Sequence, residues 1–342
     1  MGNISVELVG DALKKHTVIN KDVAKADFAR ATSVTLDKFC KKVTKIKGSY
    51  HVLHSIMTHV VQGFKAEWKE LGAFAAKSKE LKNYRQKVNF GFVPDDVMSS
   101  FLAEWYEEDK KPTDKMIAKK ITEWLLTQVQ DDLENLSIGG IYDADAAHGA
   151  FGYSLNGLEQ IVKNALADAE NPVFKIPLNV FTDDNIIDEM RKFERGLPKG
   201  MKNKFKVIHT SLNNLERYET AYFDRFGHHP SFKDSDKTKS PLKKREIVGH
   251  EGLSDDIMFA TLDGNILNLI DVIDNPPKFT DVQVLDYKVK MFMEFWKGYD
   301  FLINQAVCVA NFTSAVRGLG DEDQMKLYFP REQKITAPPV TP

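Results

Sequence analysis

The chain has 342 residues, enough for one large domain or two of moderate size. Hydrophobic residues make up 42% and charged residues 28%, so a sizeable core is possible and global disorder is excluded. The 47 basic and 49 acidic side chains leave a formal net charge of −2, which excludes a strongly basic nucleic-acid-binding protein.

The first 44 residues are predicted to form an N-terminal arm. Residues 1–20 show little hydrophobic periodicity, whereas residues 22–43 carry apolar side chains at the mixed helical spacings of two short helices. The N-terminus lacks the uninterrupted apolar stretch of a secretory signal. No apolar run in the chain approaches the length that a membrane-spanning helix needs.

The next segment, residues 45–93, contains a basic excursion. Residues 50–64 are rich in β-branched and aromatic side chains, a composition that fits either a strand or a buried helix. Residues 65–87 hold seven basic and three acidic residues and have no wide apolar face. Because such a stretch cannot fold on a core of its own, we predict a protruding loop or a hairpin. A strand is predicted over residues 87–93.

The longest helical pattern extends from Asp114 to Leu136. A shorter predicted helix begins at Pro94, and the segment KKPTD separates the two. Gly139 and Gly140 are expected to end the long helix. Its apolar side chains recur at intervals of three and four residues and form one amphipathic stripe. The stripe consists of Ile117, Ile121, Trp124, Leu125, Val129, Leu133 and Leu136.

Helical and strand patterns alternate along residues 139–281, and the polar, glycine- and proline-containing residues 227–244 are predicted to form a long exposed loop. Helices are predicted at 155–169, 184–197 and 212–226, and strands at 173–181, 205–210, 245–249, 256–262 and 266–273.

Two long strands are predicted near the C-terminus. Residues 282–296 and 299–312 alternate with a period of two, so we predict a hairpin whose turn is Lys297-Gly298. The tail, residues 316–342, is polar with prolines near its end, and we expect it to be mobile or draped over another surface.

The order of these elements resembles the Hong Kong 97-type fold of tailed-bacteriophage major capsid proteins, which encapsulins and the floor of the herpesvirus capsid share. Five stretches carry the resemblance, in the family's order, over roughly residues 45–312. The first, KAEWKELGAFAAKSKELKNYRQK (65–87), resembles the extended E-loop, and the second, MIAKKITEWLLTQVQDDLENLSIGGIY (116–142), resembles the spine helix with its glycine exit. Two resemble parts of the axial domain: NPVFKIPLNVFTDDNIIDEMRKFERGLP (171–198) followed by KFKVIHT (204–210), and REIVGHEGLSDDIMFATLDGNILNLIDV (245–272). The last, FMEFWKGYDFLINQAVCVANF (292–312), resembles the closing strand pair.

This resemblance implies an α+β fold with five parts. They are an N-terminal arm (1–44), an E-loop region (45–93), a peripheral domain with the spine helix (94–138 and 282–315), an axial domain (139–281) and a C-terminal tail (316–342).

The resemblance also implies a structural, non-enzymatic role. The chain would self-assemble into pentamers and hexamers of an icosahedral phage head that encloses double-stranded DNA, without a cofactor. Its main partner would be other copies of itself. Portal, scaffold or decoration proteins would be further partners, and packaged DNA would be contacted non-specifically. Such a protein is assembled in the cytoplasm of a bacterial host and resides in the virion capsid. An encapsulin-type compartment is the alternative with the same fold.

The charge distribution suits contacts between copies. Residues 1–90 carry 17 basic and 8 acidic side chains, whereas residues 91–342 carry 30 and 41. This asymmetry reflects either drift or complementarity between the front of one copy and the body of another.

The candidate contact residues lie in two loops. In the E-loop region they are Lys65, Trp68, Lys69, Phe74, Lys77, Lys79, Lys82, Tyr84, Arg85 and Lys87. In the axial-domain loop they are His228, His229, Lys233, Lys237 and Lys239. The aromatic side chains among the E-loop lysines fit either anchors at a protein–protein contact or a platform on which nucleic-acid bases stack.

A metal-dependent cytosolic enzyme is the alternative from a different class. His51, His54 and His59 cannot supply three ligands from one strand face or one helix face, so we predict no zinc site. The acidic pairs Asp95/Asp96, Asp131/Asp132, Asp183/Asp184 and Asp255/Asp256 could bind Mg²⁺, although two pairs sit at predicted helix starts, where capping explains them.

The two cysteines are too far apart in sequence to indicate a disulfide framework or a zinc cluster, which fits a reducing cytoplasm. Lys41 and Lys42 could lower the pKa of Cys40, but a lone thiol without a base is no sign of catalysis. Cys308 is expected to be a buried apolar residue. The chain also lacks the common phosphate-binding, dinucleotide-binding, zinc-protease and serine-hydrolase motifs.

Overall fold

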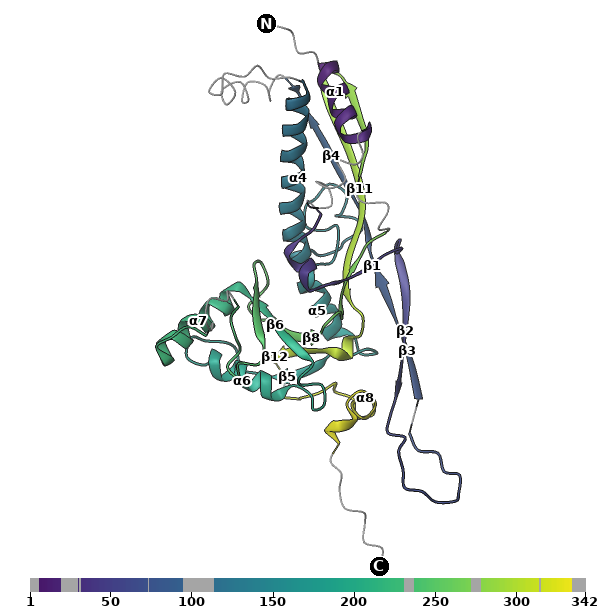
Figure 1. The fold of residues 1–342 in the computed structure, drawn as a ribbon, viewed down its shortest axis with the longest axis vertical. Helices are drawn as coiled ribbons and strands as arrows, with labels where there is room; N and C mark the ends of the chain where they lie inside the picture. The colour runs from purple at the N-terminus through teal and green to yellow at the C-terminus, as the bar shows by residue number, and fades with distance from the viewer. Residues whose placement is uncertain are drawn as a thin grey trace, which may run out of the picture. The chain divides into compact units, whose positions relative to one another are not determined.

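The computed structural model describes residues 6–19, 30, 32–72, 74–94, 114–230, 237–271, 278–313 and 315–333. The fold is α+β and divides into two compact units (Figure 1). Unit 1 comprises Met1–Ser49, Lys82–Gly157 and Asn268–Tyr299. Unit 2 comprises Tyr50–Leu81, Leu158–Leu267 and Asp300–Pro342. The helix predicted to start at Pro94 lies almost entirely outside the described residues.

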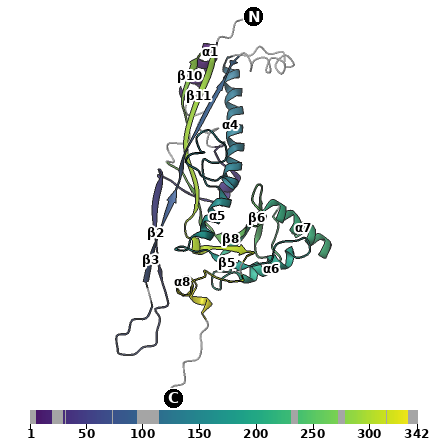
Figure 2. The same cartoon turned by 180° about the vertical axis from the view of Figure 1, so that it is seen from behind.

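Unit 1 is built around the long helix α4 (Asp114–Gly139), which runs alongside the strands of the unit's sheet in Figures 1 and 2. The predicted apolar stripe forms its buried face, except that Trp124 is half exposed. Gly140 follows the helix because a side chain there would collide with backbone: a Cβ would lie 2.6 Å from the carbonyl oxygen of Leu136. The predicted helix and its glycine exit are therefore confirmed.

The unit 1 sheet is centred on the long strand β11 (Lys288–Phe301), whose alternate side chains are buried. It pairs antiparallel with β10 (Lys278–Leu285) and with β4 (Tyr84–Phe92). The strand order is β1 (Lys41–Val43), β9 (Ile266–Leu269), β11 and β10, with β4 added to β11.

The prediction of a turn at Lys297-Gly298 was wrong, because β11 continues through both residues. The turn lies instead at Asp286-Tyr287, which have positive φ angles of 52° and 62° and pair Leu285 with Lys288. Positive φ at both central residues matches the right-handed twist of the flanking strands.

Gly298 and Lys297 have other roles. A Cβ on Gly298 would lie 2.7 Å from the carbonyl oxygen of Lys82, so glycine permits a close backbone approach. The buried Lys297 ammonium donates to the carbonyl oxygen of Thr32 (2.7 Å) and to Asp37 Oδ2 (3.1 Å). Asp37 Oδ1 also accepts from the Tyr299 hydroxyl at 2.9 Å, so this network fastens residues 32–37 to the sheet.

Residues 6–19 are helical, although residues 1–20 show little hydrophobic periodicity in the sequence. Helix α1 (Val6–Lys14) continues into the π-helical turn η1 (Lys15–Ile19), and α1 packs on α4 and β10 through the fully buried Val9 and Leu13. Of the two short helices predicted over residues 22–43, one is the 3₁₀ helix η2 (Thr35–Phe39), and residues 20–29 and 31 lie outside the described chain.

Unit 2 contains a second five-stranded sheet. Its order is β5 (Phe174–Pro177), β12 (Val307–Asn311), β8 (Met258–Leu262), β6 (Phe205–Ser211) and β7 (Glu246–His250). The outer pairs β5–β12 and β6–β7 are parallel and the inner pairs are antiparallel. The short 3₁₀ helix η3 (Asn304–Ala306) precedes β12. Helices α5 (Leu158–Ala167), α6 (Ile186–Gly196) and α7 (Leu212–Phe226) complete this part of the unit.

Local signals explain where α7 begins and ends. The Ser211 hydroxyl accepts from the backbone N–H of Asn214, and Gly227 ends the helix at φ 70°. The core against the sheet is mainly aromatic and aliphatic, with Phe174, Met190, Phe193 and Tyr218 fully buried.

The C-terminal tail was predicted to be mobile or draped over another surface, and its described residues, 315–333, pack on the rest of unit 2. Helix α8 (Glu322–Tyr328) is capped by Asp321 and is followed by η4 (Pro330–Glu332). Phe329 is buried with its ring edge against Phe174 at 4.9 Å, so this segment belongs to the core. Residues 334–342 lie outside the described chain.

Candidate functional site

The most distinctive surface of unit 2 is a hairpin of strands β2 (Ser49–Met57) and β3 (Phe74–Lys82), joined by residues 58–73 (Figures 1 and 2). In the described structure these strands pair only with each other. A two-stranded sheet is marginally stable alone because it lacks a buried apolar face. The basic excursion, predicted at residues 65–87 as a protruding loop or a hairpin, thus supplies strand β3 and part of the loop, and its partner β2 comes from residues 49–57. Of residues 50–64, predicted as a strand or a buried helix, residues 50–57 form a strand.

Several large apolar side chains are exposed in the loop of the hairpin, residues 58–73, which we call the tip. Phe64 is 99% exposed, Trp68 95% and Val61 89%. Removing one such side chain from water contributes about 1.5–3 kcal/mol of favourable free energy. Contiguous exposed apolar residues mark an interaction surface. The tip therefore has the properties of a contact surface for another molecule.

Among the described residues, the charged side chains of the tip form one ion pair, and it is exposed. Lys65 pairs with Glu67 at 2.9 Å, but both side chains are about two-thirds or more exposed, and such surface pairs contribute little. The predicted contact residues Lys65, Trp68 and Lys69 therefore lie together on the tip, and Phe74, Lys77, Lys79 and Lys82 lie on β3.

Tyr84, Arg85 and Lys87 were predicted to belong to the same excursion, but they lie on β4 in unit 1. The hairpin ends at Asn83, whose side chain donates to the carbonyl oxygen of Ile46 (2.7 Å) and accepts from the N–H of Gly48 (2.8 Å). Asn83 thereby fixes the chain between β3 and β4. Lys79 lies on the hairpin, but its ammonium is held by unit 2 itself.

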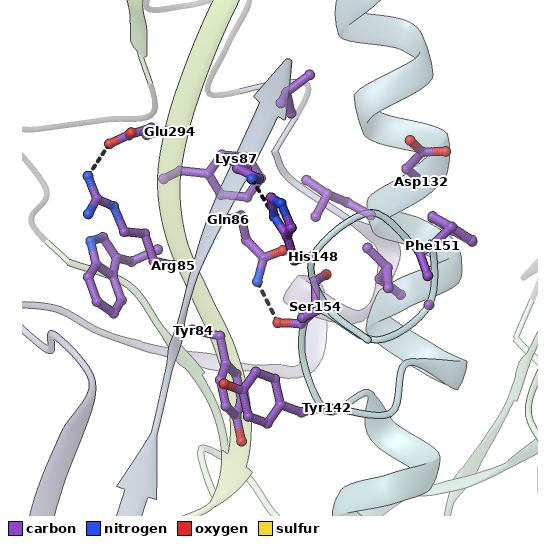
Figure 3. Close-up of a pocket in the computed structure, with 18 of the residues that line it drawn as sticks. Tyr84, Arg85, Gln86, Lys87, Asp132, Tyr142, His148, Phe151, Ser154 and Glu294 are labelled. Atoms are coloured by element: carbon purple, nitrogen blue, oxygen red, sulfur yellow. Dashed lines mark hydrogen bonds and ion pairs between the residues drawn. The ribbon is translucent and has the colours of Figure 1, made fainter. Parts of the chain in front are cut away.

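A second candidate surface is a groove of about 940 Å³ on unit 1, shown in Figure 3. Asn83 and the first six residues of β4, Tyr84 to Asn89, line one wall, and α4 with the segment 142–154 lines the other. In the described structure β4 pairs only with β11. Phe151 is 61% exposed at the groove. An unpaired strand edge with aromatic side chains beside it can accept an extended segment.

Polar contacts hold the walls of this groove. Gln86 Nε2 donates to the carbonyl oxygen of Ser154 at 2.9 Å, and Lys87 Nζ lies 2.9 Å from His148 Nδ1 (Figure 3). Tyr84 stacks on Tyr142 with ring centroids 4.0 Å apart, and Arg85 pairs with Glu294. Tyr84, Arg85 and Lys87 therefore contribute to a formed surface of unit 1.

The predicted axial-domain loop follows α7. His228 packs against the ring of Tyr222, and Lys237 pairs with Glu246 at 3.0 Å. His229 contacts Phe223, and the backbone oxygen of Lys239 accepts from the Tyr218 hydroxyl. Lys233 lies outside the described residues.

The residues that could carry chemistry have structural contacts. His54 Nε2 lies 2.7 Å from the Tyr328 hydroxyl. Asp183 pairs with Arg217, and Asp255 accepts from the Ser211 hydroxyl. Within the described ranges, no group of three His, Cys, Asp or Glu residues could hold a metal ion. Nor is any helix among these residues both apolar enough and long enough to cross a membrane.

The pKa of Cys40 is raised, contrary to the lowering expected from Lys41 and Lys42. Burial raises the pKa of this thiol well above its ordinary value, and the nearby Asp37 carboxylate adds to the effect. Cys308 is fully buried, as expected, and its pKa is also raised by burial.

Comparison with known proteins gives matches in structure alone. No family model and no curated protein matches the sequence. A chain of the satellite phage P4 procapsid including the size determination (Sid) protein superimposes with a TM-score of 0.50 and 10% identity, over 85% of this chain and 98% of that one. A chain of the cyanophage A-1(L) capsid asymmetric unit gives 0.51 and 12%, over 83% and 92%. A chain of Gordonia phage Cozz gives 0.50 and 12%, over 82% and 86%.

Proposed function

We propose that this chain, which has the Hong Kong 97-type fold of the phage capsid structures just described, is the major capsid subunit of an icosahedral phage head. One observation of the chain itself carries the proposal: the hairpin extends an aromatic tip into solvent. Ordering such a tip loses conformational entropy, which burial against another copy offsets. The similar structures named above come from phages, which favours a phage head over an encapsulin-type compartment.

The two units suggest how the fold is used. We assign unit 1, with α4 as the spine helix, to the peripheral domain. The five-stranded sheet and helices of unit 2 are assigned to the axial domain, around which copies form pentamers and hexamers. The hairpin of β2 and β3 is assigned to the E-loop, which lies across a neighbouring copy.

A closed shell requires contacts between two different surfaces of the same chain, because only such heterologous contacts form rings. The tip supplies one surface, with Lys65, Trp68 and Lys69 as contact residues. The groove of unit 1 has the properties of a receiving surface, because it combines an unpaired strand edge with the exposed Phe151.

The remaining partners follow from the same proposal. Packaged double-stranded DNA is contacted through non-specific electrostatic interactions, and portal, scaffold and decoration proteins are additional partners. Assembly takes place in the cytoplasm of the bacterial host, and the mature protein resides in the virion capsid.

Negative-stain electron microscopy of the purified full-length protein tests the proposal. We expect shells, tubes or capsomers from the unaltered chain. The double variant Phe64→Ser/Trp68→Ser removes apolar side chains that have no packing role in the subunit, so we expect a folded subunit that does not assemble.

Val180→Ser is the matched control, since Val180 is a 70% exposed apolar residue elsewhere in unit 2 and its loss should leave assembly intact. A compact monomer at high concentration for the unaltered chain contradicts the proposal. Unchanged assembly of the tip variant contradicts the role of the tip.

A further inference from the structure

We infer that Lys79 is a positioning residue that fixes the direction of the hairpin relative to the unit 2 core, an inference that rests on the proposed function. Its ammonium donates to Asp300 Oδ1 at 2.5 Å, to the carbonyl oxygen of Phe301 at 2.7 Å and to Asn304 Oδ1 at 2.7 Å. Three acceptors satisfy all three N–H groups of a lysine. The side chain is only 12% exposed, which is rare for lysine unless it is paired.

The acceptors around Lys79 are themselves held in place. Asp300 Oδ1 also accepts from the backbone N–H of Phe301, and the Phe301 ring is fully buried in unit 2. Asn304 Nδ2 donates to the carbonyl oxygen of Asn171 at 3.0 Å, next to β5. Burial raises the pKa of Asp300, whereas the Lys79 charge opposes that rise. The lysine therefore enters a polar socket made by the end of β11 and by η3, whose acceptors have further contacts in unit 2.

A second contact holds the other strand of the hairpin. His54 on β2 meets the Tyr328 hydroxyl at 2.7 Å, and Tyr328 belongs to α8, directly before the buried Phe329. Burial lowers the pKa of His54, and the charges of Lys77 and Lys79 lower it further. The lowered pKa favours the neutral ring, which shares a hydrogen bond with the tyrosine. Each strand thus has a polar anchor to the core, and beyond β2 His59 Nε2 lies 3.4 Å from the carbonyl oxygen of Pro330.

Both anchors lie near the base of the hairpin, so small changes at either one alter the direction in which the hairpin points. A strand extends about 3.3 Å per residue, so the residues between Lys79 and Trp68 convert a small change of angle at the base into a displacement of several ångströms at the tip. Copies in one shell must present the tip at closely similar angles. Few side chains of the hairpin are buried, the apolar Leu81 on β3 among them, so the polar anchors contribute to setting that angle.

The test measures hairpin direction separately from assembly. Spin labels are attached at cysteines that replace Glu70 in the tip and Glu251 in the body of unit 2, in the full-length chain kept monomeric by Phe64→Ser/Trp68→Ser. Cys40 and Cys308 are replaced by serine and alanine to remove other labelling sites. Pulsed electron paramagnetic resonance then gives the distribution of distances between the labels.

We expect a single narrow distance distribution with Lys79 present and loss of that narrow peak in Lys79→Met, which keeps the aliphatic stem and removes the ammonium. Lys77→Met, on the same strand, is the matched control and should keep the narrow peak. Asp300→Asn keeps the socket's shape but weakens the ion pair, so it should broaden the peak even if Lys79→Met fails to fold.

A distribution that is equally narrow in Lys79→Met and Asp300→Asn overturns the positioning role. In the assembly-competent background, Lys79→Met should reduce the yield of shells while Lys77→Met does not. If the unaltered protein forms no shells but the distance distribution still depends on Lys79, the positioning role stands and the capsid proposal fails.

Discussion

Two histidines in the unit 2 core form a buried pair that the sequence did not single out. His209 Nδ1 on β6 lies 2.9 Å from His250 Nε2 on the neighbouring β7, and both rings are almost fully buried. The His209 ring also stacks on Phe259 at 4.9 Å. Burial lowers the pKa of His250 to about 4. Burial, followed by the neighbouring His250, lowers the pKa of His209 well below its usual value.

This pair predicts that the subunit loses stability in mild acid. Both folded-state pKa values lie below the value of about 6.5 for an unfolded histidine. As the pH falls below about 6.5, the unfolded chain takes up protons that the folded chain cannot, and the free energy of unfolding drops by up to about 1.4 kcal/mol per pH unit for each histidine. Denaturant titrations of the non-assembling tip variant between pH 7.5 and pH 5 measure this slope.

The matched comparison is His250→Gln in the same background. Glutamine keeps a donor and an acceptor but does not titrate, so the slope of stability against pH should become shallower. An unchanged slope would show that other groups cause the loss in acid.

At the scale of single elements, the sequence predicted those whose signals are local. The stripe of α4 and the bounds of α7, predicted at residues 212–226, follow from hydrophobic periodicity, as do the strands of the five-stranded sheet of unit 2. A protruding loop or hairpin was predictable at residues 65–87, because a basic segment with no wide apolar face cannot form a core of its own. These features depend on residues that are close in the sequence, so each can be predicted from its own segment alone.

The errors arose where a distant segment decides the local structure. Lys-Gly is a common turn signal, but Gly298 is required by the approach of the Lys82 backbone, and Lys297 is required by Asp37. The true turn, Asp286-Tyr287, has no glycine to mark it. Likewise, the packing of α1 depends on surfaces that lie far along the chain. The same holds for the site: nothing near Lys79 in the sequence identifies Asp300 and Asn304 as its acceptors.

The role of Gly298 predicts the effect of Gly298→Ala. The new Cβ would lie 2.7 Å from the carbonyl oxygen of Lys82 and 2.8 Å from Asn83 Cα, and the Asn83 side chain holds that backbone in place. We expect the free energy of unfolding to fall by about 1–3 kcal/mol, the usual cost of forcing extra atoms into a packed site. Urea denaturation of the non-assembling variant measures it.

Gly91→Ala is the control because it lies on β4, which pairs with the same strand, β11. There the nearest atom to a Cβ is the carbonyl oxygen of Val289 at 3.8 Å, an ordinary contact, so stability should change little. Equal effects of the two substitutions would contradict a role of Gly298 in close backbone approach.

At the scale of the whole molecule, the charge is unevenly distributed along the chain. Residues 1–90 have a net charge of +9, from 17 basic and 8 acidic side chains, and residues 91–342 have −11, from 30 and 41. Some of the basic groups are engaged within the subunit, as Lys79 is with Asp300. The lysines of the tip are exposed and therefore available to an acidic surface on another copy.

This distribution predicts that electrostatic attraction speeds assembly. Salt screens the attraction between exposed charges beyond the Debye length, which is about 10 Å at 0.1 M and about 3 Å at 1 M. Assembly followed by light scattering should therefore slow as the salt concentration rises. The variant Lys65→Gln/Lys69→Gln should assemble more slowly at low salt and depend less on salt. Lys119→Gln, which removes an exposed lysine from α4, should keep the salt dependence of the unaltered chain. If salt instead accelerates assembly of the unaltered chain, the contact is governed by the apolar side chains of the tip, and the charge asymmetry has no part in it.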